Sequence, residues 1–488
     1  MRKQIRFMLG HEKRQLDAVD PTMTVLRYLR ETERMMGTKE GCAEGDCGAC
    51  TVVIGEPDAG GMTYRAVNSC IQFVPLLDGK QLITVEHLGD EDGAMHPVQR
   101  AMCDHHASQC GFCTPGFVMS LCAQTLNHAK PDRAQLKDVL AGNLCRCTGY
   151  GPILDAGEEA MQGEVDDQFS RVAHETSETL SAWQDGATVQ INGQGRSYYA
   201  PATIDDLAAL CKEYPDAHIV SGLTDVGLWV TKQHRDLNTL IYVGNIPGLK
   251  AIETGPEDIS IGAGATLSQL HDELGRHYAD LGELIRRFAS LQIRNVATIG
   301  GNIANGSPIG DLPPALIALG SRLVLRCGDR QRTLALEDFF ITYGQQDRQP
   351  GEFVEQVIVP LIGDRAAFRC YKLSKRFDQD ISAVCGAFRV DIEDGKVGDI
   401  RICYGGMAGT PQRAAACENA LRGAPWTEAS VRSAMATLDQ DYSPLTDMRA
   451  SAEYRARAAR NLLLKFFFET TDPQDQTRVL SVPDHAHG

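Results

Sequence analysis

The sequence predicts a multidomain α+β protein with a cysteine-rich first third. The chain has 488 residues, which is enough for three or four domains. Its first 160 residues hold two groups of four closely spaced cysteines, and from about residue 196 strand-like and helical patterns alternate. Glycine-rich loops between these elements indicate bound groups that approach the backbone closely.

The composition of the chain argues against several classes of protein and partner. The formal net charge of −16 argues against a nucleic-acid partner. No run of 18 apolar residues predicts a membrane span, and the start of the chain lacks the apolar run of a signal peptide. Sixteen cysteines without an export signal indicate reduced thiols and metal centres, so we expect a cytoplasmic protein without membrane spans.

The first cysteine group follows a predicted hairpin over 4–20 and a helix that Thr24 caps. Its spacing, Cys-x4-Cys-x2-Cys with one distant cysteine, is the plant-type pattern for a [2Fe-2S] cluster. Glycines in the loop permit positive φ, so that backbone N–H groups can point at the cluster. The alternative is a glycine-rich loop with incidental cysteines. The predicted ligands are Cys42, Cys47, Cys50 and Cys70.

The second group forms two pairs, each just before a predicted helix. Asp132 is expected to cap one intervening helix, and Pro152 suits the first turn of another. Helix N-termini favour a negatively charged thiolate centre. Disulfides and structural zinc are alternatives, but Cys-x-Cys is unusual for zinc, so an iron–sulfur cluster is preferred. The predicted ligands are Cys110, Cys113, Cys145 and Cys147.

Eight further cysteines lie singly, mostly among apolar neighbours. Buried free cysteines usually behave as small hydrophobic side chains, and we expect that role here. These residues are Cys103, Cys122, Cys211, Cys327, Cys370, Cys385, Cys403 and Cys417.

The second half of the chain contains two glycine loops. Residues 163–195 are polar, with little apolar periodicity, and predict an exposed linker. A strand at 218–220 then enters a glycine turn and a helix, which is an arrangement that holds phosphate on backbone N–H groups. Alone this signal is weak, because it matches neither common nucleotide motif. A second loop over 297–311 precedes an apolar helix and ends in Asp311, a candidate acceptor for ribityl or ribose hydroxyls.

Two motifs, Cys-Gly-Phe-Cys-Thr-Pro-Gly and Cys-Arg-Cys-Thr-Gly-Tyr, occur almost letter for letter, and with the plant-type spacing they resemble the molybdenum hydroxylase family. One departure is Gly151, where the family commonly has arginine. The resemblance implies a β-grasp plant-type ferredoxin domain, a four-helix [2Fe-2S] domain, an α/β FAD-binding domain of the vanillyl-alcohol oxidase type and a C-terminal α+β flavoprotein domain. The expected boundaries are 1–86, 87–162, linker 163–195, 196–365, 366–470 and a polar, disordered tail 471–488.

The resemblance also implies residue roles. Gln109 would approach the molybdopterin cofactor of a partner; otherwise it is a polar residue at a helix end. Lys372 opens a charged segment that resembles the one near the flavin edge; otherwise this is a solvated loop. Asn305 departs from the threonine or small residue of relatives. The implied FAD contacts are Ile219, Val220, Ser221, Gly222, Leu223, Thr224, Asp225, Val226, Phe288, Thr298, Gly301, Asn302, Asn305, Asp311 and Lys372.

The order of sites, two clusters followed by a flavin, implies an electron-transfer subunit. By resemblance this subunit serves the xanthine dehydrogenase branch of the family, with NAD as the acceptor. No molybdopterin domain is present, so no catalytic residue for substrate hydroxylation is expected on this chain. A large molybdopterin-binding partner subunit would carry it, in a heterotetramer of two copies each. Alternatives are a module for an aldehyde, nicotinate or other aromatic hydroxylase, or a stand-alone iron–sulfur flavoprotein reductase.

Overall fold

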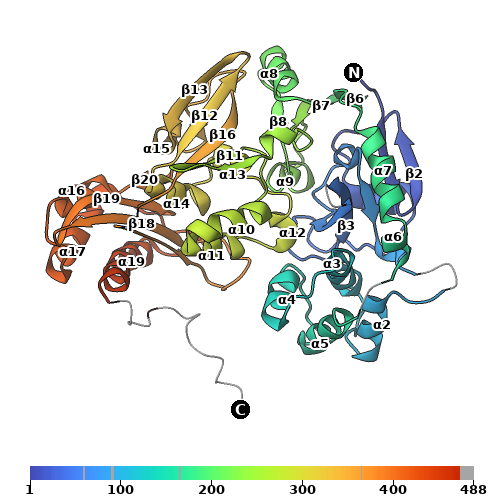
Figure 1. Cartoon of the computed structure of the whole chain (residues 1–488), viewed down its shortest axis with the longest axis horizontal. Coiled ribbons are helices and arrows are strands. Elements are labelled where there is room, and N and C mark those ends of the chain that lie inside the picture. Colours follow the sequence, from blue (N-terminus) through green and yellow to red (C-terminus); the bar gives the residue numbers. More distant parts are fainter. Residues whose placement is uncertain (59–60, 90–92, 164–165, 364, 473–476, 478–488) are drawn as a thin grey trace.

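The computed structural model describes residues 1–58, 61–89, 93–163, 166–363, 365–472 and 477. Four parts follow one another along the chain (Figure 1): an N-terminal sheet, a helical domain, a central domain of two sheets, and a C-terminal sheet with helices. The central domain lies between the cysteine-rich parts and the C-terminal part. Most of the predicted polar tail lies outside the described residues.

The N-terminal domain is a mixed five-stranded sheet of order β2-β1-β5-β3-β4, in which only the β1–β5 pairing is parallel. Ile5, Phe7 and Leu9 alternate along β1 and are buried, as a half-buried strand requires. The Thr24 hydroxyl caps α1 as predicted. This topology confirms the ferredoxin-type sheet. Its elements are β1 (Ile5–Leu9), β2 (Glu12–Leu16), α1 (Val25–Arg27), β3 (Thr51–Asp58), β4 (Gly61–Asn68) and β5 (Gln81–Ile83).

The helical domain packs on this sheet through α3, whose side chains are buried along most of its length and contact β3 and β4. The predicted start signals are confirmed: Asp132 and Gln135 form a capping box on α4, and Pro152 lies in the first turn of α5. The helices are α2 (Pro97–Asp104), α3 (Thr114–Leu126), α4 (Arg133–Leu140) and α5 (Gly151–Ala160).

The predicted exposed linker, 163–195, is corrected in part. It contains α6 (Gln168–Arg171) and α7 (Ala173–Trp183), and α7 packs against β3 and β4. Phe169 and Leu180 are fully buried. Because only one narrow stripe of α7 is apolar, its periodicity was too weak to indicate a helix.

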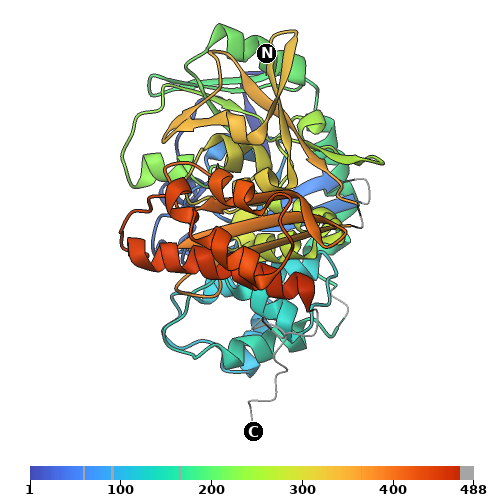
Figure 2. The same cartoon turned by 90° about the vertical axis from the view of Figure 1, so that its left-hand side faces the viewer.

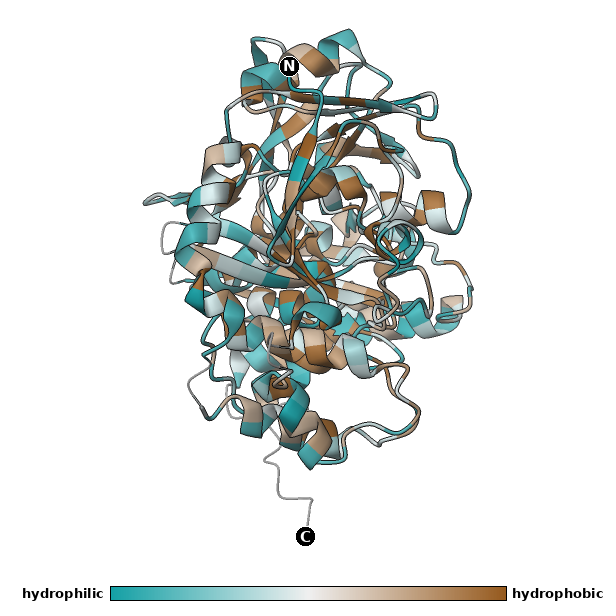
Figure 3. Cartoon of the chain, turned by 90° about the vertical axis from the view of Figure 1, so that its right-hand side faces the viewer, coloured by the Kyte–Doolittle hydropathy of each residue, from teal (hydrophilic) through white to brown (hydrophobic). Residues whose placement is uncertain are grey.

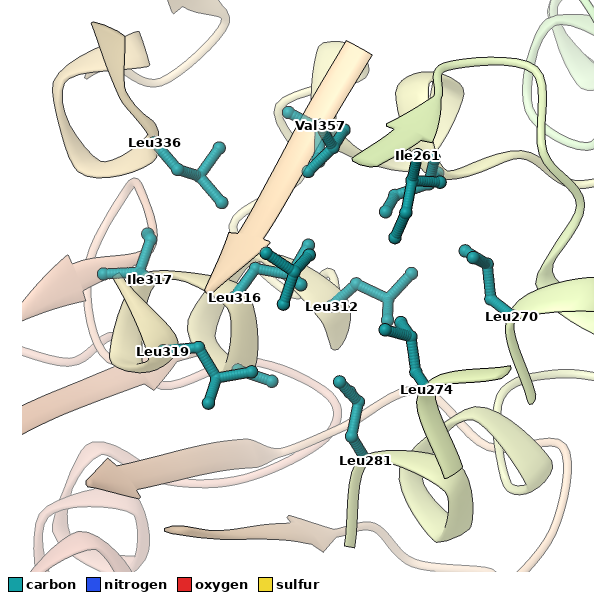
Figure 4. Close-up of a cluster of buried hydrophobic side chains, with 14 of the residues drawn as sticks. Ile261, Leu270, Leu274, Leu281, Leu312, Leu316, Ile317, Leu319, Leu336 and Val357 are labelled. Atoms are coloured by element: carbon teal, nitrogen blue, oxygen red, sulfur yellow. The ribbon is translucent and has the colours of Figure 1, made fainter. Parts of the chain in front are cut away.

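The central domain contains a four-stranded sheet, β6-β7-β9-β8, and a five-stranded sheet, β10-β11-β16-β12-β13. Every residue of α14 is buried, and burying each leucine contributes about 1.5–3 kcal/mol. Figure 4 shows these leucines between α10 and strand β16. The strands are β6 (Val189–Gly193), β7 (Arg196–Ala200), β8 (His218–Val220), β9 (Thr239–Tyr242), β10 (Ile252–Thr254), β11 (Asp258–Gly262), β12 (Arg322–Cys327), β13 (Arg330–Ala335) and β16 (Phe353–Pro360).

Helix α9 follows the first glycine loop, and the predicted second loop, 297–311, is corrected in part because it contains helix α13. Thr203 caps α8 and Thr298 caps α13, each by accepting a backbone N–H. The helices are α8 (Ile204–Glu213), α9 (Val226–Thr231), α10 (Leu267–His277), α11 (Ala279–Arg286), α12 (Leu291–Arg294), α13 (Ile299–Ala304), α14 (Leu312–Leu319) and α15 (Leu336–Phe339). A small hairpin of β14 (Phe340–Thr342) and β15 (Gln345–Gln346) follows them.

The C-terminal domain is an antiparallel sheet of order β17-β18-β19-β20, with helices crossing one face (Figure 2). The other face receives α14, which contacts β18 and β19. The elements are β17 (Ala366–Leu373), β18 (Val384–Glu393), β19 (Lys396–Gly405), β20 (Gln412–Arg413), α16 (Ala415–Leu421), α17 (Glu428–Met435), α18 (Leu438–Asp441) and α19 (Ala452–Thr471).

Hydropathy follows this arrangement: hydrophobic residues gather on the elements in the middle of the molecule (Figure 3). Among the described residues, no helix combines the length and the apolar character needed to cross a membrane.

A half-buried charge network joins the N-terminal sheet to the central domain. Lys80 Nζ lies 2.9 Å from a Glu56 carboxylate oxygen and donates to the Tyr242 hydroxyl at 3.1 Å. Arg65 pairs with the other Glu56 oxygen. Burial by itself raises the pKa of Glu56, but Lys80, Lys250 and Arg65 together hold that pKa well below its ordinary value.

We therefore expect the stability that Glu56 contributes to depend on pH. A depressed carboxyl pKa stabilises the fold above the ordinary value of about 4.3, and this contribution is lost as the pH falls below it. At pH 7 the Glu56→Gln variant should unfold at a temperature lower by at least about 2–4 °C. The difference in unfolding temperature between the wild type and the variant should disappear as the pH is lowered from 7 to 3, as measured by thermal unfolding. A gap that is constant with pH would contradict this role.

Candidate redox site

The first cysteine loop connects α1 and β3 and lies over the edge of the N-terminal sheet. Cys42 Sγ accepts N–H groups from Glu44 at 3.5 Å and Cys47 at 3.4 Å. The neighbouring Cys47 and Cys70 thiols and these N–H groups lower the pKa of Cys42 against the effect of burial. Cys50 and Cys70 are only 2% exposed and contact each other. The loop, with Cys70 just after the end of β4, thus brings the four predicted thiols together and supplies N–H donors to sulfur.

Glycine permits this loop to turn tightly. Gly45 and Gly48 have φ of +79° and +69°, in the left-handed region that favours glycine. A Cβ on Gly48 would lie 2.2 Å from the Gly142 carbonyl oxygen of the helical domain. Glycine at 48 therefore serves both the local turn and the close approach of the two domains.

The second cysteine group lies at the surface of the helical domain, before α3 and α5. Cys110 and Cys147 are exposed, and Cys113 and Cys145 are half-buried. The thiol pairs Cys110–Cys147 and Cys113–Cys145 are each in contact. Cys145 Sγ receives N–H groups from Cys147 at 3.4 Å and Thr148 at 3.5 Å. The Thr148 hydroxyl and these N–H groups lower the pKa of Cys145 although burial raises it.

The thiols of both groups are thus in pairwise contact. Within the described ranges, no group of three or more His, Cys, Asp or Glu side chains is placed to hold a single metal ion. Contacts between pairs of thiols fit a two-iron cluster, in which each iron takes two thiolates.

The remaining cysteines follow the prediction with two exceptions. Cys103 on α2 is exposed, and Cys327 at the end of β12 is half-buried. Each lies on the solvent-facing side of its helix or strand. Successive residues of such an element face different sides, so apolar sequence neighbours do not show whether a cysteine is buried. The other six are buried.

A backbone hydrogen bond joins the two cysteine groups. The Leu144 N–H donates to the Cys47 carbonyl oxygen at 3.0 Å. Leu144 immediately precedes Cys145, so one ligand candidate of each group lies at either end of this contact. Sequence reasoning did not single out Leu144, because the contact depends on how two domains pack.

The first glycine loop of the central domain connects β8 and α9. Leu223 has φ +57°, an uncommon conformation for a branched residue. In the part of the chain that the structure describes, the backbone N–H groups of Gly222, Leu223, Thr224 and Asp225 donate no hydrogen bond. Consecutive free N–H groups form an anion-binding nest, as predicted for a phosphate.

The second glycine loop meets the first. A Cβ on Gly222 would lie 1.9 Å from the Val296 carbonyl oxygen and 2.9 Å from the Ala297 backbone nitrogen, so the first loop approaches the start of the second at backbone distance. Thr298 begins α13, and the Asn302 amide oxygen is buried with no hydrogen-bond partner among the described residues. Such an orphaned acceptor suits a bound polar group. Gly301 and Asn305 are exposed beside it.

Asp311, Lys372 and Phe288 complete this region. Lys372 Nζ lies 2.7 Å from an Asp311 carboxylate oxygen, and both side chains are at most 4% exposed. Ser382 donates to the other Asp311 oxygen, and Lys372 also reaches the carbonyl oxygen of Arg287, next to the half-buried Phe288. The structure thus pairs two predicted flavin contacts with each other. Ser382 was not predicted, since it lies far from Asp311 in the sequence.

Two domains with four-cysteine sites and a domain with two adjoining glycine loops are the parts expected of an iron–sulfur flavoprotein. Family models agree with each part. The model described as a 2Fe-2S iron-sulfur cluster binding domain matches 7–73, and that of a [2Fe-2S] binding domain matches 84–158. The FAD binding domain in molybdopterin dehydrogenase matches 190–362, and the CO dehydrogenase flavoprotein C-terminal domain matches 369–470.

The chain is similar to known proteins over nearly its whole length. It is 31% identical to a xanthine dehydrogenase of Emericella nidulans over 95% of this chain and 38% of that protein. It is 32% identical to xanthine dehydrogenase 1 of Arabidopsis thaliana over 92% of this chain and 38% of that protein. Among solved structures, reconstituted CO dehydrogenase from Oligotropha carboxidovorans aligns with TM-score 0.52 and 26% identity, over 56% of this chain and 96% of that chain.

The chain belongs to the molybdenum hydroxylase family, and within it forms an electron-transfer module with two [2Fe-2S] domains and an FAD-binding domain. It spans about 38% of the length of the xanthine dehydrogenases to which it is similar.

Proposed function

We propose that this chain is the electron-transfer subunit of a xanthine dehydrogenase. A partner subunit with molybdopterin oxidises hypoxanthine and xanthine to urate, and this chain delivers the electrons to NAD. Similarity to named xanthine dehydrogenases over 92–95% of the chain supports this branch. Similarity to carbon monoxide dehydrogenase structures extends over only 55–56%. The cytoplasm, which keeps thiols reduced, is the proposed location.

The observation that carries this proposal is the order of the sites in space. An exposed cysteine group is joined by the Leu144–Cys47 hydrogen bond to a second, buried group. Ile293 and Leu228 of the central domain pack against the buried cluster that contains Cys50 and Cys70. The three sites therefore form a continuous series from the surface of the helical domain to the central domain.

In this proposal the predicted cysteines and loop residues hold the cofactors. Cys42, Cys47, Cys50 and Cys70 bind one [2Fe-2S] cluster, and Cys110, Cys113, Cys145 and Cys147 bind the other. The free N–H groups at 222–225 hold the FAD diphosphate, with Asn302 and the second loop beside it. When bound, the clusters supply one-electron transfer and FAD supplies hydride transfer to NAD.

The partner binds the exposed end of the series. Phe112, Leu144 and Tyr150 surround the second cysteine group and are 48%, 41% and 38% exposed. Gln109 is exposed beside them, where it can reach a cofactor in the partner. Large exposed apolar side chains around a polar site are typical of a protein interface. We propose a heterotetramer with two copies of each subunit.

Purification of the native complex tests the partner and the substrate together. A tagged chain should bring down one large subunit and molybdenum. Xanthine should bleach the iron–sulfur absorption of this complex, while carbon monoxide, nicotinate and simple aldehydes should not. Bleaching by one of those compounds alone would assign the module to another branch. Absence of molybdenum and of any large partner would favour the stand-alone reductase.

A flavin-depleted variant tests the direction of electron flow. Gly222→Ala places a Cβ 1.9 Å from the Val296 carbonyl oxygen, which separates the two loops and should empty the flavin site. In the complex, xanthine should still bleach the clusters, but NAD should no longer be reduced, because no hydride donor remains. The complex should still reduce artificial one-electron acceptors with xanthine as the electron donor.

The matched control is Gly363→Ala, since a Cβ there meets nothing within 4 Å. This variant should keep its flavin and its NAD reduction. If the flavin-free enzyme reduced NAD at the wild-type rate, the flavin would not be the site that passes electrons to NAD. Clusters that stay oxidised with xanthine would show that they are not the route.

A further inference from the structure

Helix α12 of the central domain inserts one polar side chain between the two cysteine-bearing domains. Gln292 is 1% exposed. Its Nε2 donates to the Asn143 amide oxygen at 3.0 Å and to the Ser120 hydroxyl at 3.1 Å, both in the helical domain. Its neighbour Ile293 packs against a buried cluster of the N-terminal domain that includes Cys50 and Cys70. One short helix therefore contacts all three domains.

The partners of Gln292 lie beside the contact between the two cysteine groups. Asn143 Nδ2 donates to the Gly48 carbonyl oxygen at 3.1 Å, and Gly48 directly follows Cys47. The next residue after Asn143 is Leu144, whose N–H donates to Cys47. Ser120 also donates to the Asn143 amide oxygen, at 2.7 Å. The amide oxygen of Asn143 is thus held by Gln292 and Ser120, and its amide nitrogen holds the cysteine loop through Gly48.

Gln292 also restrains the backbone of the helical domain directly. A Cβ on Gly142 would lie 2.0 Å from Gln292 Oε1, so the glutamine side chain packs on the Gly142 backbone. This close contact holds residues 142–144 against the cysteine loop. Gly142 does not have a positive φ, so a larger residue there acts through Gln292 and neighbouring Ser290 rather than through backbone strain.

We propose that Gln292 is a positioning residue for electron transfer between the two cysteine groups. By fixing Asn143 and Gly142 it keeps the Leu144–Cys47 hydrogen bond closed, and it does so only when the central domain is docked. Docking of the flavin domain would thereby set the contact between the clusters. This inference deepens the proposed function, because it rests on both cysteine groups being cluster sites.

Amide hydrogen exchange of the full cluster-loaded chain tests the contact directly. Gln292→Leu keeps much of the volume but removes the donor, so the Leu144 amide should exchange about tenfold faster, the equivalent of one lost hydrogen bond. Gln292→Glu should do at least as much, since a carboxylate cannot donate to Asn143. The magnetic interaction between the two reduced clusters, measured by EPR, should weaken in the same variants.

Gly142→Ala provides an independent variant, because its Cβ must displace the Gln292 side chain. It should show the same faster exchange of the Leu144 amide and the same weaker interaction between the clusters. The double variant with Gln292→Leu should differ little from either single variant in these two measurements. Gln233→Leu, at an exposed glutamine on the same domain, is the control and should match the wild type. Faster exchange spread evenly over the chain would mean general destabilisation and would overturn the proposal.

Wild-type Leu144 protection in Gln292→Leu would overturn it equally. Neither readout needs xanthine, NAD or the partner subunit. A complex that oxidises another substrate would disprove the proposed function and leave this inference intact, so the two failures are distinguishable.

Discussion

The Cys147→Ser variant is expected to lose one iron–sulfur cluster and keep the other. Serine is a poor ligand for iron in these clusters, so the iron content should fall from about four to about two atoms per chain. FAD content should stay at the wild-type level, because Cys147 is an exposed residue of the helical domain and lies outside the FAD-binding domain. Xanthine-dependent reduction of the flavin should fall below detection, since the lost cluster is the only proposed entry point. Iron analysis, EPR and flavin absorption measure these outcomes.

Cys103→Ser is the matched control for this experiment. Cys103 is an exposed cysteine on α2 and falls outside both ligand spacings. Its iron content should equal that of the wild type. If Cys147→Ser retained about four irons, or Cys103→Ser lost any, the proposed ligand set would be wrong.

Removing Asp311 is expected to be the most destabilising change in the central domain. Asp311→Ala leaves the Lys372 ammonium, whose side chain is 2% exposed, without its carboxylate partner. Breaking a buried pair from one side costs about 3–5 kcal/mol. The variant should also bind FAD weakly or not at all, because the pair lies among the predicted flavin contacts. Thermal unfolding and flavin content of the purified chain provide the two readouts.

The double variant Asp311→Ala with Lys372→Met separates stability from flavin binding. Replacing both members of a buried ion pair by apolar groups is often nearly neutral, so most of the lost stability should return. FAD should stay absent, because both polar contacts are gone. Wild-type flavin content in the double variant would reject a role of this pair in the flavin site.

Much of this architecture follows from local signals. The Cys-x4-Cys-x2-Cys spacing predicted a loop that the structure shows with its four thiols gathered together. Asp132 and Thr24 were predicted to cap helices and do so. Residues 218–232 predicted a strand, a glycine turn and a helix, and the structure has β8, a turn with free N–H groups, and α9; phosphate binding by this turn stays a prediction. These features depend on chemistry within a few neighbouring residues, which the sequence displays directly.

The features that escaped prediction are contacts between domains. Gln292 and Asn143 have no local signature, and they meet only because three domains pack together. The pairing of Asp311 with Lys372 joins the start of α14 to β17, and these segments come together because α14 packs on the C-terminal sheet. Helix α7 was not predicted because it has a single narrow apolar stripe, which gives only a weak periodic pattern in the sequence. This stripe packs against the N-terminal sheet.

The burial of Cys50 and Cys70 has a consequence for how the protein matures. Both thiols are 2% exposed, in a buried cluster against which Ile293 and Leu228 of the central domain pack. If these cysteines bind the proposed inner [2Fe-2S] cluster, we expect iron to be inserted faster while the central domain is undocked. Cys110 and Cys147 remain exposed and can receive iron afterwards. We therefore expect a chain that folds without iron to acquire its outer cluster more readily than its inner one.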